Sequence, residues 1–184
     1  YPPERIEALV NEILRGNYRV KHRAAIECRV GPFEPEYGLN DVVLREQRSR
    51  LITLSVHDGE QFVNAYDCDG LIFCTATGST AYNLSAGGPI LDPALDALAM
   101  TPICPHALSN RSVIFPDKAR LRVACRSAEA CPQVSIDGRT IDFNAADGEV
   151  GLRIIPDRVR LIHAPGYSHF ATIRTKLNWT EANR

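Results

Sequence analysis

The chain has 184 residues, of which 45% are hydrophobic, so it can bury a core without disulfides or metals to hold it together. Its formal net charge of −1 gives no overall attraction to nucleic acid or to an anionic membrane surface. No apolar run approaches the roughly 20 residues that a membrane-spanning helix needs. We therefore expect a folded domain whose partners include neither nucleic acid nor a membrane.

The cysteines indicate the same class of protein. None of the six belongs to a Cys-x-x-Cys pair, and none has a histidine partner at zinc-binding spacing. Free thiols and a reducing cytoplasm are the simplest interpretation, and we expect no metal held by the protein itself. The opening residues, Tyr1-Pro2-Pro3, are neither an initiator methionine nor a signal peptide, so we expect the chain to begin inside a longer protein.

The first predicted element is a helix over 4–15, which Gly16 ends. Its apolar residues follow the i, i+3, i+4, i+7 spacing of a helix that lies on a core. These residues are Ile6, Leu9, Val10, Ile13 and Leu14. From residue 18 the spacing changes to a period of two, which predicts a long, half-exposed strand over 18–30.

Short strands dominate the rest of the chain after a Gly- and Pro-containing loop at 31–38. Three Asp-Gly pairs, at 58–59, 137–138 and 147–148, predict hairpin turns. Short strands with almost no helices between them indicate a mainly β, antiparallel sandwich-like domain. Strands are predicted over 42–44, 51–56, 61–65, 71–74, 121–124, 134–136, 140–141, 150–155 and 159–163.

Two other segments have weaker patterns. Residues 91–110 contain three prolines and no clean period, so we expect irregular chain there. Residues 169–179 have apolar side chains at helical spacing and are predicted to be weakly helical.

The most informative segment is 75–90. The apolar run 71–74 leads into a turn around Gly78, where Thr77, Ser79 and Thr80 crowd together, and a short helix over 81–86 follows. A helix start rich in hydroxyls and free N–H groups can bind anions or ribose oxygens. The same spacing also fits a capped helix after a turn, with no ligand at all.

At this segment the sequence resembles the NAD kinase family. The block 69–90 is similar to that family's central signature, and further similar segments follow the family's order along nearly the whole chain. These segments are 39–44, 102–111, 135–138 and 167–179. Lipid kinases that act on diacylglycerol or sphingosine share the architecture but lack the long Thr-Gly-Ser-Thr-Ala-Tyr block.

The resemblance implies an activity and a domain division. NAD kinases transfer a phosphoryl group from ATP, or from polyphosphate, to the 2′-hydroxyl of the adenosine ribose of NAD, which makes NADP. The resemblance further implies Mg²⁺ or another divalent metal with ATP, a homodimer or homotetramer, and the cytoplasm. It assigns residues 18–184 to the β-rich, NAD-binding carboxy-terminal domain and residues 1–17 to a helix that connects it to an amino-terminal α/β domain.

That amino-terminal domain carries the family's Gly-Gly-Asp-Gly loop, whose aspartate is thought to activate the substrate hydroxyl. The tetrapeptide is absent here, so we expect no catalytic residue in this chain and no activity from the chain alone. A non-catalytic module that binds NAD or NADP is the alternative.

The resemblance also implies a set of NAD-binding residues. Asn40 and Asp41 would meet the adenosine, although an Asx pair often merely turns the chain. Asp69 would lie near the nicotinamide end of a neighbouring subunit's site, unless it only begins an Asp-Gly turn. Asp137 would face the ribose, and Arg139 stands where many relatives have glutamine.

The start of the short helix supplies the remaining four implied NAD-binding residues. They are Thr80, Ala81, Tyr82 and Ser85. Thr80 contributes a hydroxyl, Ala81 permits close approach, and Tyr82 offers an aromatic face, unless its ring packs in the core.

Overall fold

The computed structural model describes residues 3–46, 51–127, 132–141 and 148–179. The chain divides into two compact units, one made of 1–21 with 160–184 and the other of 22–159. The first unit holds a 3-10 turn η1 (Pro3–Arg5) and the helices α1 (Ile6–Leu14) and α3 (His169–Lys176). The second unit holds the β-sheets and the candidate site.

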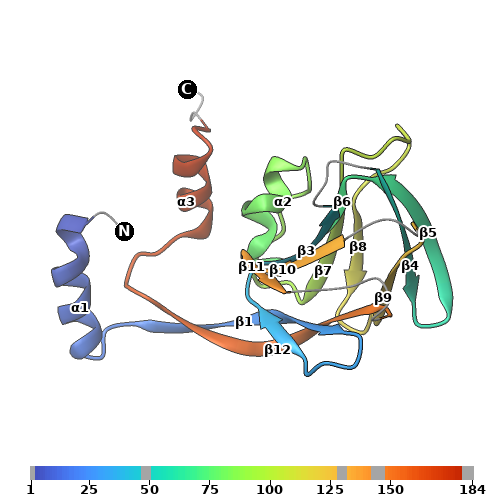
Figure 1. Cartoon of the computed structure of the whole chain (residues 1–184). Coiled ribbons are helices and arrows are strands. Elements are labelled where there is room, and N and C mark those ends of the chain that lie inside the picture. The colour runs from blue at the N-terminus through green and yellow to red at the C-terminus, as the bar shows by residue number, and fades with distance from the viewer. Residues whose placement is uncertain (1–2, 47–50, 128–131, 142–147, 180–184) are drawn as a thin grey trace. The chain divides into compact units, whose positions relative to one another are not determined.

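Two six-stranded sheets make up the fold (Figure 1). The first has the order β2-β1-β12-β9-β4-β5 and the second has the order β11-β10-β3-β6-β7-β8. The first sheet contains β1 (Arg19–Val30), β2 (Glu36–Gly38), β4 (Ile52–Asp58), β5 (Gln61–Cys68), β9 (Leu121–Cys125) and β12 (Val150–His163). The second contains β3 (Asp41–Glu46), β6 (Gly70–Thr75), β7 (Ala97–Ile103), β8 (Val113–Pro116), β10 (Pro132–Ile136) and β11 (Arg139–Ile141).

The two sheets pack face to face on one large apolar core. Ile26 and Leu54 from the first sheet and Leu44 and Phe73 from the second all belong to it and are almost fully buried. Each strand contributes alternate residues, because successive side chains of a strand point to opposite faces. The mainly β, antiparallel sandwich-like fold expected from the sequence is confirmed.

The second sheet is also covered on its outer face. There Val43, Ile72, Cys74 and Ala99 form a second apolar cluster with Ala76 and Leu91, which flank the short helices η2 (Gly78–Thr80) and α2 (Tyr82–Ser85). Every residue of β6 is therefore buried. A continuous apolar run such as 71–74 is typical of a strand covered on both faces.

One prediction about this sheet was wrong. Residues 91–110 were expected to be irregular, yet they contain β7, which pairs with β6 on one side and β8 on the other. Pro102 lies beyond the part of β7 that pairs with β8, at a position where a strand tolerates proline. The residues before it are good helix formers, and strand pairing in the folded protein overrides that local preference.

Three smaller differences between prediction and structure also arise because strand pairing overrides local sequence preference. The predicted loop over 31–38 contains the short edge strand β2, strand β8 was not predicted, and the two strands expected over 150–163 form the single strand β12. Hairpin turns at 58–59 and 137–138 are confirmed by the pairing of the strands that flank them. In the third expected turn, Asp147 lies outside the described residues.

The predicted helix over 4–15 is present as η1 and α1, and Gly16 ends it with a positive φ of 78°. The predicted burial of its apolar stripe is not found. Ile6, Val10 and Leu14 are all exposed, and no described residue of α1 is buried. The spacing of apolar residues indicates only that the helix has an apolar face. The described residues do not cover that face. The weak helix expected at 169–179 is present as α3.

Candidate functional site

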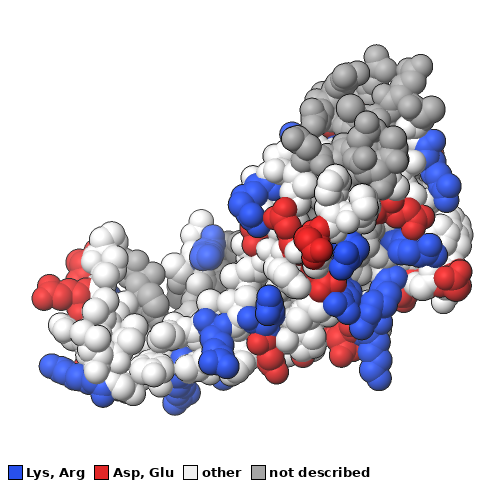
Figure 2. All heavy atoms as spheres, turned by 60° about the horizontal axis from the view of Figure 1, so that its bottom comes forward, with Lys and Arg blue, Asp and Glu red and all other residues white. Residues whose placement is uncertain are grey.

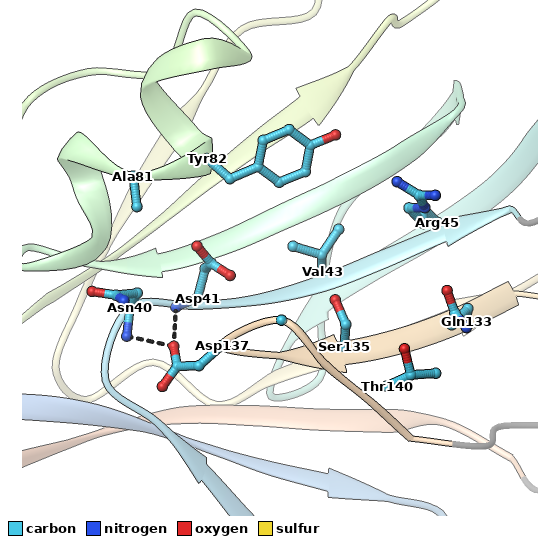
Figure 3. A pocket seen from close by; sticks show the side chains of 11 residues that line it. Asn40, Asp41, Val43, Arg45, Ala81, Tyr82, Gln133, Ser135, Asp137 and Thr140 are labelled. Atoms are coloured by element: carbon cyan, nitrogen blue, oxygen red, sulfur yellow. Dashed lines mark hydrogen bonds between the residues drawn. The ribbon is translucent and has the colours of Figure 1, made fainter.

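A pocket of about 470 Å³ lies on the outer face of the second sheet (Figure 3). Its floor comes from β3, β10 and the turn that joins β10 to β11, and the residues between η2 and α2 form its rim. The lining residues are Asn40, Asp41, Val43, Arg45, Ala81, Tyr82, Gln133, Ser135, Asp137, Gly138 and Thr140.

Strand register explains which side chains share the floor. Asp41, Val43 and Arg45 alternate along β3 and therefore point to one face. Val43 pairs with Ser135 and Arg45 pairs with Gln133 across the antiparallel ladder between β3 and β10. Directly paired residues project to the same side of a sheet, so these strands form one continuous surface.

The Asp137 carboxylate fixes the end of this floor. Its Oδ2 accepts a hydrogen bond from the Leu39 backbone N–H at 2.7 Å. Its Oδ1 accepts from the N–H groups of Asn40 at 2.8 Å and Asp41 at 3.1 Å. Asp137 and Gly138 both have positive φ, 46° and 78°, as the two-residue turn of a hairpin requires. The resemblance implied that this carboxylate would face the ribose. Its hydrogen bonds show that it holds the backbone of residues 39–41 in place.

The Thr-Gly-Ser-Thr turn packs on the same segment. Thr75 Oγ1 donates to the Leu39 carbonyl at 2.7 Å, and the Thr75 N–H donates to the Asn40 carbonyl at 2.9 Å. A side chain at Gly78 would bring its Cβ to 2.0 Å from the Asn40 carbonyl oxygen. Glycine is therefore required at 78 because two backbone segments touch there.

Buried polar groups hold the rest of the signature segment. Asn83 is fully buried, and its Nδ2 donates to the carbonyls of Ser79 at 3.1 Å and Pro89 at 3.0 Å. Its Oδ1 accepts from Thr101 Oγ1 at 2.7 Å. Ser79 Oγ donates to the Ala76 carbonyl at 2.7 Å. Neither η2 nor α2 is capped by the side chain of its own N-cap residue; the Ser79 hydroxyl binds backbone, and the Thr101 hydroxyl binds the Asn83 side chain.

Asp41 differs from Asp137, because its carboxylate has no hydrogen-bond partner among the described residues. The residue is only 8% exposed, and the carboxylate faces the pocket (Figure 3). Burial, and to a smaller extent the charge of Asp137, raises the pKa of Asp41. Its oxygens open onto the pocket, since they are not among the fully buried atoms that lack a partner. They can accept a hydrogen bond from a ligand that brings a hydroxyl or amino group.

The aromatic rim is more open. Tyr82 is 40% exposed although it belongs to a helix that packs on the sheet, and it lines the pocket beside Ala81. Its ring is therefore not a core residue. An exposed aromatic face over a polar floor can stack on a planar ring while the floor binds the attached sugar.

The structure brings five of the nine predicted site residues together, and they are Asn40, Asp41, Ala81, Tyr82 and Asp137. Thr80 and Ser85 lie nearby in η2 and α2 but are not among the lining residues. Asp69 precedes β6 at the end opposite Asn40, and its role in a neighbouring subunit's site stays a prediction. Arg139 forms an ion pair with Glu36 at 3.3 Å and does not line the pocket.

Sequence reasoning missed six lining residues, Val43, Arg45, Gln133, Ser135, Gly138 and Thr140. The alternation along β3 was available as a signal, because Val43 and Arg45 follow Asp41 at steps of two. The contribution of β10 depends on its register with β3, which a single sequence does not reveal.

The described residues contain no group of three or more His, Cys, Asp or Glu side chains placed to hold a metal ion. Both Asp137 oxygens already accept hydrogen bonds from the backbone, which leaves Asp41 as one isolated carboxylate. The described part of this chain therefore does not fit a resident divalent ion. Within the same residues, none of the helices has the length and apolar character needed to cross a membrane.

Fold and pocket together define a β-sandwich domain that carries a polar pocket with an aromatic rim. The family described as the ATP-NAD kinase C-terminal domain matches residues 39–164. The chain therefore belongs to the NAD kinase family and forms its C-terminal domain, as the signature segment indicated.

Individual relatives agree. An NAD kinase of Pseudomonas putida (strain W619) is 39% identical, over 96% of this chain and 62% of that protein. An NAD kinase of Pseudomonas aeruginosa (strain LESB58) is 40% identical over the same shares. The chain thus spans less than two thirds of the length of these curated relatives.

Two solved structures share the fold. Yeast NADH kinase, complexed with NADH, superposes with a TM-score of 0.84 and 25% identity, over 98% of this chain and 56% of that one. An NAD kinase from Archaeoglobus fulgidus, in complex with ATP, superposes with a TM-score of 0.78 and 22% identity, over 97% of this chain and 68% of that one.

Proposed function

We propose that this chain is the dinucleotide-binding part of an NAD kinase, which phosphorylates the 2′-hydroxyl of the adenosine ribose of NAD with ATP or polyphosphate and so makes NADP. The observation that carries the proposal is the Asp41 carboxylate, which faces the pocket and has no hydrogen-bond donor among the described residues. Adenosine offers what such a carboxylate needs, hydroxyl and amino hydrogens on one rigid unit.

Each pocket residue has a separate task in this proposal. Asp41 accepts from a hydroxyl or amino group of the adenosine, and the Asn40 amide can donate or accept beside it. Tyr82 stacks on a ring of the substrate, and Ala81 leaves room for that ring. Asp137 acts as a positioning residue, since its carboxylate holds the backbone of Asn40 and Asp41.

Phosphoryl transfer depends mainly on positioning and on neutralisation of charge. Holding the acceptor is the part that this chain performs, and the proposal assigns it no metal ligand and no catalytic base. The sequence contains no Gly-Gly-Asp-Gly tetrapeptide, so the group that activates the hydroxyl belongs to an amino-terminal α/β domain. Residues 1–17 connect to that domain, and the 184 residues alone are inactive.

The wider setting of the enzyme belongs to the same proposal. The divalent ion, Mg²⁺ by preference, arrives with ATP. The active enzyme is a cytoplasmic homodimer or homotetramer, in which Asp69 reaches the site of a neighbouring subunit.

The test is NADP formation by the full-length protein with NAD, Mg²⁺, and either ATP or polyphosphate as the donor. Asp41→Asn removes the charged acceptor at nearly constant shape, and we expect it to raise the KM for NAD about tenfold or more. Tyr82→Ala should also raise that KM, while Lys118→Gln, a change at an exposed position outside the pocket, should not.

Two outcomes would contradict the proposal, and each has a different meaning. Binding of NAD without NADP formation under varied donors and metals would identify a non-catalytic NAD-binding module. Unchanged KM values in both pocket variants would show that the acceptor binds elsewhere.

A further inference from the structure

Arg45 is an arginine without a partner among the described residues of the pocket. It is exposed on β3, four residues after Asp41, and it lines the pocket (Figure 3). Its guanidinium makes no hydrogen bond or ion pair with any described residue. Other arginines of the same sandwich are engaged, since Arg126 donates to Ser55 Oγ at 2.9 Å and Arg153 forms a double hydrogen bond with Glu27.

The neighbours of Arg45 leave its charge uncompensated. On one side it pairs with Gln133, which is neutral, and on the other with Gly70, which has no side chain. A Cβ on Gly70 would approach the Arg45 Cβ to 2.8 Å, so glycine at 70 lets the two strands touch. Asp69 precedes Gly70 and forms no ion pair with Arg45. Arg45 is the single basic residue among the described residues that line the pocket.

The pocket floor is therefore polarised along β3. Asp41 and Asp137 lie at one end, and Arg45 with the Gln133 amide lies at the other. Four residues of extended strand separate Asp41 from Arg45, about 13 Å between Cα atoms. Figure 2 shows that Lys and Arg side chains elsewhere on the visible face are interspersed with Asp and Glu, as expected for a solvated surface. Within the pocket the two signs are separated.

We propose that Arg45, with Gln133, is the anion-binding end of this pocket and holds the diphosphate of the dinucleotide whose adenosine meets Asp41. This inference rests on the proposed function and extends it. Guanidinium groups bind phosphate oxygens through paired, charge-assisted hydrogen bonds, and the Gln133 amide can add a neutral donor.

Binding measurements on the full-length protein test this assignment, with NAD, ATP and adenosine as probes. Arg45→Gln should weaken the binding of NAD about tenfold, the usual effect of losing one charge-assisted hydrogen bond. It should change the affinity for adenosine by no more than about twofold. Arg45→Lys should lose less, since it keeps the charge but not the paired geometry. Added salt should weaken NAD binding more steeply in the wild type than in Arg45→Gln.

A second variant acts without touching Arg45. Gln133→Glu places a carboxylate directly opposite the guanidinium, so it should weaken NAD about as much as Arg45→Gln does. Lys118→Gln removes one exposed positive charge outside the pocket and serves as the control.

Three results would overturn the assignment. They are equal NAD affinity in the wild type and both pocket variants, an equal loss for NAD and adenosine, and a loss confined to ATP, which would place Arg45 at the phosphoryl donor. If the wild type neither binds NAD nor forms NADP, the proposed function itself fails, and this inference fails with it. NADP formation with a normal KM in Arg45→Gln would reject the inference alone.

Discussion

The two sheets of the sandwich treat their outer faces differently. On the first sheet, half of the residues of β5 are exposed, Thr53 and Asp67 form a hydrogen bond at the surface, and Glu27 pairs with the partly exposed Arg153. On the second sheet, β6 is buried throughout, and the signature segment closes over it. The candidate pocket lies on this second sheet.

This difference explains why the outer face of the second sheet is more rigid than that of the first. Thr75, Ser79, Asn83 and Thr101 are all almost fully buried over the second sheet, and each is hydrogen-bonded. Because a buried polar group left unpaired is costly, such a network tolerates few alternative arrangements. The outer face of the first sheet contains contacts that water can replace. Six substitutions measure this contrast.

The largest effect should come from Gly78→Ala. The new Cβ would meet the Asn40 carbonyl oxygen at 2.0 Å, and neither backbone can move without disturbing the pocket. We expect a loss of about 3 kcal/mol or more in the free energy of unfolding, measured by denaturant titration. Gly151→Ala in β12 is the control, because its Cβ would find nothing closer than 3.9 Å. Similar stability in the two variants would contradict the packing argument.

Asn83→Ala should rank second. It leaves the Ser79 and Pro89 carbonyls and the Thr101 hydroxyl without their amide partner in a buried setting. We expect a loss of about 2 kcal/mol. Thr53→Val removes a 2.6 Å hydrogen bond to Asp67 on the first sheet and should cost less than about 1 kcal/mol. Equal losses would remove the distinction between the two outer faces.

Asp41→Asn should stabilise the protein while it weakens NAD binding. The pKa of Asp41 is raised by burial and then by Asp137, so the folded state holds this proton more tightly than the unfolded state. Stability is therefore lost as pH rises from the ordinary aspartate range through the raised pKa. Above that range we expect the variant to melt about 2 to 4 °C higher, the response of a domain of this size to about 1 kcal/mol. A lower Tm at neutral pH would mean that Asp41 has a stabilising partner.

The smallest effect should come from Glu27→Gln on the first sheet. Hydrogen bonds from Arg153 lower the pKa of Glu27, so the ion pair stabilises the fold above the ordinary glutamate pKa, and this stability is lost as pH falls through the lowered value. The Arg153 side chain is 42% exposed, which weakens the pair through solvent screening. Chemical unfolding at pH 7 should show a loss of about 0.5 kcal/mol. The difference between variant and wild type should vanish at acidic pH.

Local sequence patterns predicted the elements whose signals are local. The run 71–74, the Asp-Gly turns at 58–59 and 137–138 and the alternation after residue 18 each depend on neighbouring residues, and all of them correspond to observed strands or hairpins. Strand β7 was missed because its pairing with β6 and β8 decides its conformation, and its own residues favour helix. The exposed apolar stripe of α1 shows a second limit of local patterns: an amphipathic pattern predicts a helix but does not identify what covers its apolar face.

The candidate site shows the same distinction between residues with a local sequence signal and residues that only the fold brings together. Asn40, Asp41, Ala81 and Tyr82 belong to segments that resemble the family, and the structure gathers them. Arg45 and Gln133 have no motif, and they become neighbours only through the register of β3 with β10. The second role of Asp137, which holds the 39–41 backbone, is likewise visible only once the fold brings the two segments together.

The hydrogen bond from the Leu39 N–H to Asp137 links residues 98 positions apart. Such a contact forms only after a long loop has closed, and long-range strand pairing is slow compared with local structure. A growing polypeptide that has completed its signature segment still lacks the β10–β11 hairpin that orients Asn40 and Asp41. The pocket is thus completed late in the synthesis of this domain, and a translation product that stops before residue 132 would have the family signature and the β3 part of the pocket floor but not the part from β10.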